Sequence, residues 1–113
     1  MPTEYSGTYK PTAIYYPPVS DPSDDLWTGQ VTVAVAGTAQ IGPDVVGVNG
    51  FYIRALDDNI APVYVGNDGS KDVSNTTGYE LAPGESIVAH ILNMNALYVD
   101  AINAGDGICW LKA

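Results

Sequence analysis

The residues that could do chemistry in this chain are few, and the most reactive are one histidine and one cysteine. His90 is the only histidine and Cys109 the only cysteine among the 113 residues. Metal sites with paired histidines, intrachain disulfides and Cys-His or Ser-His catalysis that needs a second histidine are therefore excluded. A dyad of Cys109 and His90 could form if the two lie in neighbouring strands. The alternative is a small buried Cys109 in the last strand and a partly exposed or hydrogen-bonded His90.

The carboxylates are the second candidate source of chemistry. Asn67, Asp68, Gly69 and Asp72 vaguely resemble a calcium loop, but their spacing departs from the EF-hand pattern, so turn chemistry is the preferred interpretation. A glycosidase-like pair stays open among the thirteen acidic residues, although nothing nominates a particular pair. We therefore expect a protein that is not an enzyme, with no catalytic residue, no metal and no cofactor.

The charge of the chain excludes further classes of function. Four basic residues face thirteen acidic ones, which gives a formal net charge of −9. Nucleic-acid binding and docking on an anionic membrane both need a basic surface, so neither partner is expected. No apolar run approaches the ~20 residues of a membrane helix, and the first residues lack the pattern of a signal peptide, which predicts synthesis in the cytoplasm without secretion. The acidic surface suits a basic protein partner.

The elements that must position these side chains fall into two parts. Residues 1–28 hold five of the eight prolines and four of the eight tyrosines. Proline disfavours both helices and central strands, so this segment is predicted to be an extended arm. Disordered linkers lack aromatic residues, whereas tyrosine suits interfaces. The arm could cover its own domain, lie across a neighbouring subunit or remain a flexible tail. Its candidate partner-binding residues are Tyr5, Tyr9, Tyr15, Tyr16 and Trp27.

Residues 29–113 show short strand patterns separated by Gly, Pro, Asn and Asp clusters. In the clearest of them, Phe51, Ile53 and Ala55 share one face, opposite Tyr52, Arg54 and Leu56. The predicted strands are VTVAVA (31–36), FYIRALD (51–57), PVYVG (62–66), YELA (79–82), SIVAHIL (86–92), ALYVDAI (96–102) and GICWLK (107–112). Short loops favour antiparallel pairing. We predict an all-β domain, an antiparallel β-sandwich or small jelly-roll or barrel of about seven to eight strands.

Two connections carry specific predictions. Pro83 and Gly84 are expected at the second and third positions of a type II turn, which fixes the register of the strand that follows. Asn93, Met94 and Asn95 are expected to form a hairpin turn rather than to continue a helix. The polar loop 67–78 is expected to be exposed at the surface.

The run from Val63 to Leu111 resembles a pattern of small β-domains in structural proteins of tailed phages. In that pattern a strand ending in YVG precedes a polar loop, then G-x-x-L-x-P-G-E, a strand, LYV-x-A and a closing G-D-x-[ILV] hairpin. The matching residues are Tyr64, Val65, Gly66, Gly78, Leu81, Pro83, Gly84, Glu85, Leu97, Tyr98, Val99, Ala101, Gly105 and Asp106. With VTVAVAGTAQ as first core strand, the resemblance covers about residues 31–112, and the arm lies outside it.

The resemblance implies an accessory virion protein, most like a capsid decoration (cement) protein. It implies a β-domain on the capsid exterior that binds the major capsid protein and forms a homo-oligomer, taken as a homotrimer. The alternative is a head-fibre or tail-tip module that binds host glycans, for which Tyr52, Tyr64, Tyr79 and Tyr98 could provide stacking faces. These tyrosines could equally be core or cross-strand partners.

Overall fold

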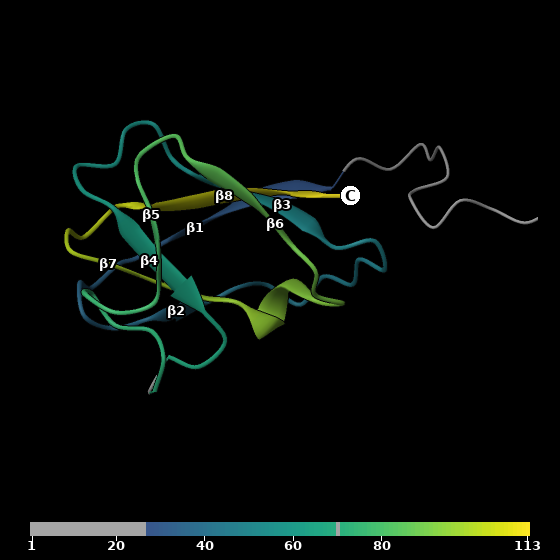
Figure 1. The fold of residues 1–113 in the computed structure, drawn as a ribbon, viewed down its shortest axis with the longest axis horizontal. Helices are drawn as coiled ribbons and strands as arrows, with labels where there is room; N and C mark the ends of the chain where they lie inside the picture. The colour runs from purple at the N-terminus through teal and green to yellow at the C-terminus, as the bar shows by residue number, and fades with distance from the viewer. Residues whose placement is uncertain (1–26, 70) are drawn as a thin grey trace, which may run out of the picture.

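A computed structural model describes residues 27–69 and 71–113 of the chain (Figure 1). Within this part, almost all regular structure is β, with one short 3₁₀ helix at Met94–Ala96. The strands are β1 (Thr28–Thr32), β2 (Gln40–Ile41), β3 (Phe51–Ala55), β4 (Val63–Gly66), β5 (Tyr79–Leu81), β6 (Ser86–Ala89), β7 (Tyr98–Ala101) and β8 (Gly107–Lys112). The all-β prediction is confirmed.

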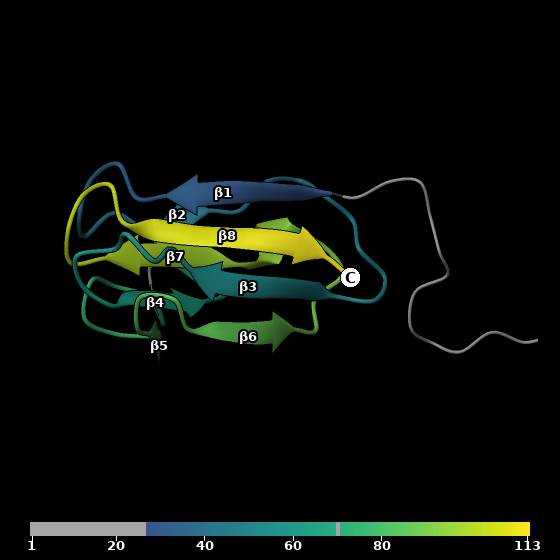
Figure 2. The same ribbon diagram turned by 90° about the horizontal axis from the view of Figure 1, so that it is seen from above.

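The eight strands form two four-stranded sheets, ordered β1-β8-β3-β6 and β2-β7-β4-β5. All pairs are antiparallel, and Figure 2 shows one sheet lying over the other. Only β4 and β5 are neighbours both in the chain and in a sheet, and every other connection between consecutive strands passes from one sheet to the other. This order, in which the chain alternates between two facing sheets, is that of a jelly roll.

The strand faces follow the alternation of the sequence. Phe51, Ile53 and Ala55 of β3 are fully buried, whereas Tyr52 and Arg54 are exposed on the other face. The same period of two appears in β4, where Val63 and Val65 are buried. Each fully buried aliphatic or aromatic side chain contributes about 1.5–3 kcal/mol relative to exposure, so the inner faces hold the sheets together.

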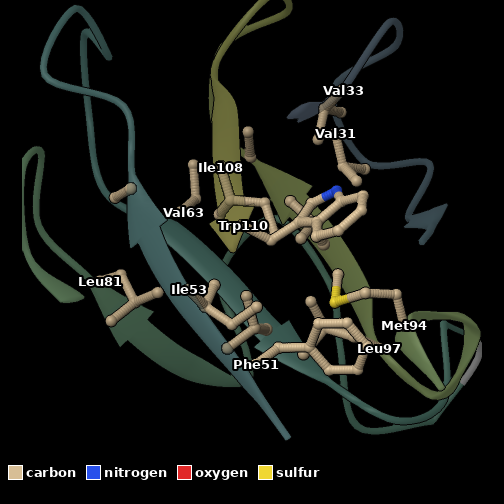
Figure 3. Packing of buried hydrophobic residues seen from close by; sticks show 14 residues of the cluster. Val31, Val33, Phe51, Ile53, Val63, Leu81, Met94, Leu97, Ile108 and Trp110 are labelled. Atoms are coloured by element: carbon tan, nitrogen blue, oxygen red, sulfur yellow. The ribbon is translucent and has the colours of Figure 1, made fainter. Parts of the chain in front are cut away.

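The core contains an aromatic pair (Figure 3). The rings of Phe51 and Trp110 meet edge to face, with centroids 5.8 Å apart and planes at 82°. Trp110 lies against Gly29 of the neighbouring strand, where a Cβ would approach the indole to 2.8 Å. Met94 and Leu97, from the connection before β7, are also buried in the core. The glycine therefore makes room for the largest side chain of the core.

The first strand lies earlier in the chain than its Val-rich sequence predicted. β1 ends at Thr32, because the backbone of the next residue, Val33, pairs with the loop before β8: it donates to Asp106 O and accepts from Gly105 N. The chain then turns at Gly37, whose φ of +90° favours glycine. Val33 still packs in the core, so the hydrophobic signal was correct and only the strand's end was misplaced.

The two predicted turns had different outcomes. Gly84 has a φ of +83°, and Glu85 N donates to Ala82 O at 2.9 Å, which confirms the Pro-Gly turn. The Asn-Met-Asn prediction was wrong, because the strands on its two sides, β6 and β7, belong to different sheets. Asn93 instead begins the 3₁₀ helix, where its side chain accepts from Asn95 N at 2.9 Å. A short polar connection does not by itself distinguish a hairpin from a crossing between sheets.

Candidate interaction surface

His90 and Cys109 do not come together. Cys109 lies on β8, half-buried on the outer face of the sheet, and its Sγ donates to Arg54 O at 3.6 Å. His90 follows β6, which is separated from β8 by β3, so about 10 Å of sheet lies between their strands. His90 is exposed. The geometry gives the thiol no imidazole partner, and the expectation of a fully buried Cys109 was wrong because the outward positions of this sheet are open.

The acidic loop uses its side chains to shape its own backbone. Asp72 accepts hydrogen bonds from Asp68 N at 2.8 Å and from Asn67 N at 3.4 Å. Among the described residues, no group of three His, Cys, Asp or Glu side chains is placed to hold a metal ion. The hydrogen bonds of Asp72 to the loop backbone confirm the turn interpretation. Val73 from the same loop is buried, so the loop is not purely a surface feature.

The loop after β3 is fixed mainly by hydrogen bonds to the start of β8. Arg54 and Asp57 form an exposed ion pair at 2.6 Å, which contributes little in water. Asn59 is more important, since its buried amide donates to Gly107 O and accepts from Gly107 N, both at 2.9 Å. These bonds join the loop after β3 to the start of β8.

Two aspartates, Asp100 and Asp106, are buried, which is a common feature of functional sites, and the sequence did not predict their burial. Asp106 accepts from Ile60 N with both oxygens, at 3.0 and 3.1 Å, and from Ala61 N at 3.1 Å. Asp100 accepts from Gly37 N at 3.0 Å and Ala101 N at 2.7 Å through Oδ1, whereas Oδ2 has no partner. Asp100 lies in β7 and Asp106 in the loop before β8, and both bond backbone groups, so their geometry indicates a structural role. Asp106 stood in the G-D motif, but no local signal distinguished Asp100.

Of the five predicted partner-binding residues, Tyr5, Tyr9, Tyr15 and Tyr16 lie outside the described residues. Trp27 is described, and its side chain is 48% exposed. Its carbonyl accepts from Lys112 N at 2.9 Å, and Lys112 Nζ lies 5.5 Å from the centroid of the Trp27 ring. Trp27 therefore continues the pairing of β1 with β8 and offers an exposed aromatic surface at that end of the sandwich.

The four tyrosines considered for glycan stacking do not form one platform. Tyr52 lies on the outer face of the β1-β8-β3-β6 sheet and is 51% exposed. The other three belong to the β2-β7-β4-β5 sheet, where Tyr79 is exposed on an edge strand and Tyr64 and Tyr98 are half-buried. Tyr98 borders an open, shallow hollow of about 380 Å³ together with Thr38 and Asp68.

The most distinctive surface is the outer face of the β1-β8-β3-β6 sheet. The strand register places Thr28, Leu111, Tyr52 and Val88 in one row across the four strands. The next outward row contains Gln30, Cys109, Arg54 and Ser86. Between β1, β8 and β3 runs an open groove of about 310 Å³, lined by Thr28, Tyr52, Cys109 and Leu111 among others. We call it the sheet groove.

The fold and this surface define the class as a small jelly-roll domain with an apolar groove on one sheet face. Searches against protein-family models, curated proteins and solved structures found no match to the chain. None of the helical segments among the described residues is long and apolar enough to cross a membrane.

Proposed function

We propose that this chain is a non-enzymatic structural protein of a tailed-phage particle. It binds the outer surface of the capsid as a decoration, or cement, subunit and bridges neighbouring copies of the major capsid protein. It is made in the host cytoplasm and acts as a homo-oligomer, taken as a trimer. Each copy contributes a modest contact, and linked copies gain avidity without a new contact.

The observation that carries the proposal is the position of the phage-like residues in the fold. Gly78, Gly84 and Gly105 all have positive φ, at +128°, +83° and +94°. Asp106 holds the loop at Ile60 and Ala61 through backbone hydrogen bonds. The pattern thus includes four residues that shape turns and loops, and we take this as support for a fold shared with the phage domains.

The acidic charge and the exposed aromatic end are consistent with this role. A formal charge of −9 favours a partner with basic patches. Trp27 and the arm tyrosines Tyr5, Tyr9, Tyr15 and Tyr16 remain the proposed anchors, because aromatic side chains dominate the energy of many interfaces.

The test is co-sedimentation of the full-length protein with tailed-phage capsids assembled from their major capsid protein alone. We expect saturable binding at a fixed ratio to the capsid subunits and a higher melting temperature of the particle. A variant with Trp27 and the four arm tyrosines changed to serine should bind more weakly. Absence of binding to capsids that carry vacant decoration positions would contradict the proposal.

A glycan-binding module is the second candidate, and one observation favours it. The hollow beside Tyr98 combines an aromatic side chain with the polar residues Thr38 and Asp68. Aromatic faces next to hydrogen-bonding groups are suited to sugars. A glycan array with the wild type and Tyr98→Ser decides this alternative, since specific binding that is lost in the variant would favour it over the capsid role.

A further inference from the structure

The two outer faces of the sandwich differ in how far loops of the chain cover them. The face of the β2-β7-β4-β5 sheet is covered by its own loops. Asp100 points outward from β7, yet it has no exposed surface, and Gly37 of the loop 33–39 donates to it. Val73 of the loop 67–78 is 3% exposed and lies over Gly66, where a Cβ would come within 2.5 Å of it.

The face of the β1-β8-β3-β6 sheet has no such cover among the described residues. Tyr52 is 51% and Val88 48% exposed, and they are cross-strand partners. Leu111 lies beside Tyr52 in the same row and is half-buried. An apolar row across a sheet, with a groove along it, is typical of a surface that another chain segment covers.

The residues that precede β1 are the candidate occupant, because they are joined directly to a strand that lines the groove. Trp27 is followed directly by Thr28, which itself lines the sheet groove. The 26 residues before Trp27 include Tyr5, Tyr9, Tyr15 and Tyr16. The four strands span about 15 Å across, whereas ten extended residues reach about 33 Å, so the arm is long enough to cross the face and return.

The composition of this segment suits contact with a face rather than pairing at an edge. Its prolines, five in residues 1–28, lack the N–H that an added strand must donate.

We propose that residues 1–26 occupy the sheet groove of their own chain, with arm tyrosines covering Tyr52, Leu111 and Val88. The tether decides between the chain's own arm and that of another copy. A short connection gives an effective concentration of about 1 mM, far above that of free copies in dilute solution. This inference concerns the free protein and does not depend on the proposed capsid role. An arm that also anchors to a capsid must first leave the groove.

Cys109 provides the test, because the single thiol of the protein lines the groove. The rate of its reaction with a maleimide is measured in the full-length wild type and in the full-length variant Y5S/Y9S/Y15S/Y16S. An arm that binds the groove with a Kd of about 0.1 mM occupies it about ten to one at the tethered concentration. We therefore expect the wild type to react about tenfold more slowly, at a rate independent of protein concentration.

Matched controls distinguish protection of Cys109 by the arm from a change in the folding of the domain. Tyr79→Ser removes an exposed tyrosine from β5, on the other sheet, and should leave the rate unchanged. In a Cys109→Ser background, a cysteine placed by Thr76→Cys in the loop 67–78 should react equally with or without the arm tyrosines. Equal Cys109 rates in the wild type and the arm variant would overturn the proposal. Protection that appears only as concentration rises would also overturn it, since the occupant would then be another copy.

Discussion

Replacing Asp106 by alanine tests whether this buried carboxylate holds the loop after β3. Asp106 is 4% exposed and accepts from two backbone N–H groups, those of Ile60 and Ala61, at 3.0–3.1 Å. Alanine leaves both donors without this acceptor. An unsatisfied buried donor costs about 1–3 kcal/mol, and exposed Ile60 lets water reach part of the site, so we expect a loss of about 2–4 kcal/mol in the free energy of unfolding.

The measurement is urea unfolding, followed by the fluorescence of buried Trp110. For a domain of this size the slope is about 1 kcal/mol per M, so a loss of 3 kcal/mol lowers the midpoint by about 3 M. Asp106→Asn should lie between wild type and alanine. Its oxygen can accept from both donors, but its amide nitrogen then faces Ile60 N at about the 3.0 Å now occupied by Oδ1.

Two controls make the result decisive. Asp58 is exposed, and Asp58→Ala should change the free energy of unfolding by no more than about 0.5 kcal/mol. Asp100→Asn keeps the acceptor of Gly37 and Ala101 and replaces the oxygen that has no partner, so its effect should not exceed about 1 kcal/mol. If Asp106→Ala is as stable as Asp58→Ala, the hydrogen-bond reasoning is refuted.

Other substitutions test the core, the turn and the exposed aromatic end. Gly29→Ala places a methyl 2.8 Å from Trp110 and should cost about 1–3 kcal/mol while changing the near-UV circular dichroism of the indole. Phe51→Ala removes half of the aromatic pair and should cost about 3–5 kcal/mol in urea unfolding, and a smaller loss would mean that the core collapses around the gap. Gly84→Ala forces a residue with a Cβ to a φ of +83° and should cost at least about 1–2 kcal/mol, which thermal unfolding will measure. Trp27→Ala removes only an exposed cation–π contact and should cost under about 1 kcal/mol, so a larger loss would assign Trp27 to the core.

The parts of the fold that sequence predicted are those set by local chemistry. The alternation in β3 gave the correct buried face, because a strand turns successive side chains to opposite sides. The turn at Gly84 followed from the need for a positive φ after proline. The loop at Asp72 also followed from short-range bonds between a carboxylate and nearby backbone N–H groups.

The parts that sequence did not predict depend on distant partners. β2 has only two residues, and nothing in Gln40–Ile41 shows that they pair with Val99 and Tyr98 of β7. The sequence also does not show to which sheet a strand belongs. For this reason the connection through Met94, which joins strands of different sheets, was predicted to be a hairpin. Asp100 points to the outer face of its sheet, and its burial depends on a loop some sixty residues earlier in the chain, where Gly37 N donates to its carboxylate.

The candidate surface was predictable in part. Alternation placed Tyr52 and Arg54 on one face of β3, but it could not show that Cys109 and Leu111 of β8 would line the same groove. That juxtaposition requires β8 to pair with β3, which is more than fifty residues earlier in the chain. The role of the arm tyrosines Tyr5, Tyr9, Tyr15 and Tyr16 stays a prediction.

Loops cover one outer face of the sandwich and leave the other open, which makes the open face the better candidate for a binding surface. The β2-β7-β4-β5 sheet has a long loop, residues 67–78, that folds over its outer face and buries Val73. The connections 82–85 and 102–106, which lead into β6 and β8, are short, and no described loop covers Tyr52 and Val88. Only the arm or another molecule can cover that face. Either the arm or a partner that binds there must contact Tyr52 and Leu111. Substitutions at these two positions therefore test both binding of the arm to its own domain and binding of a partner.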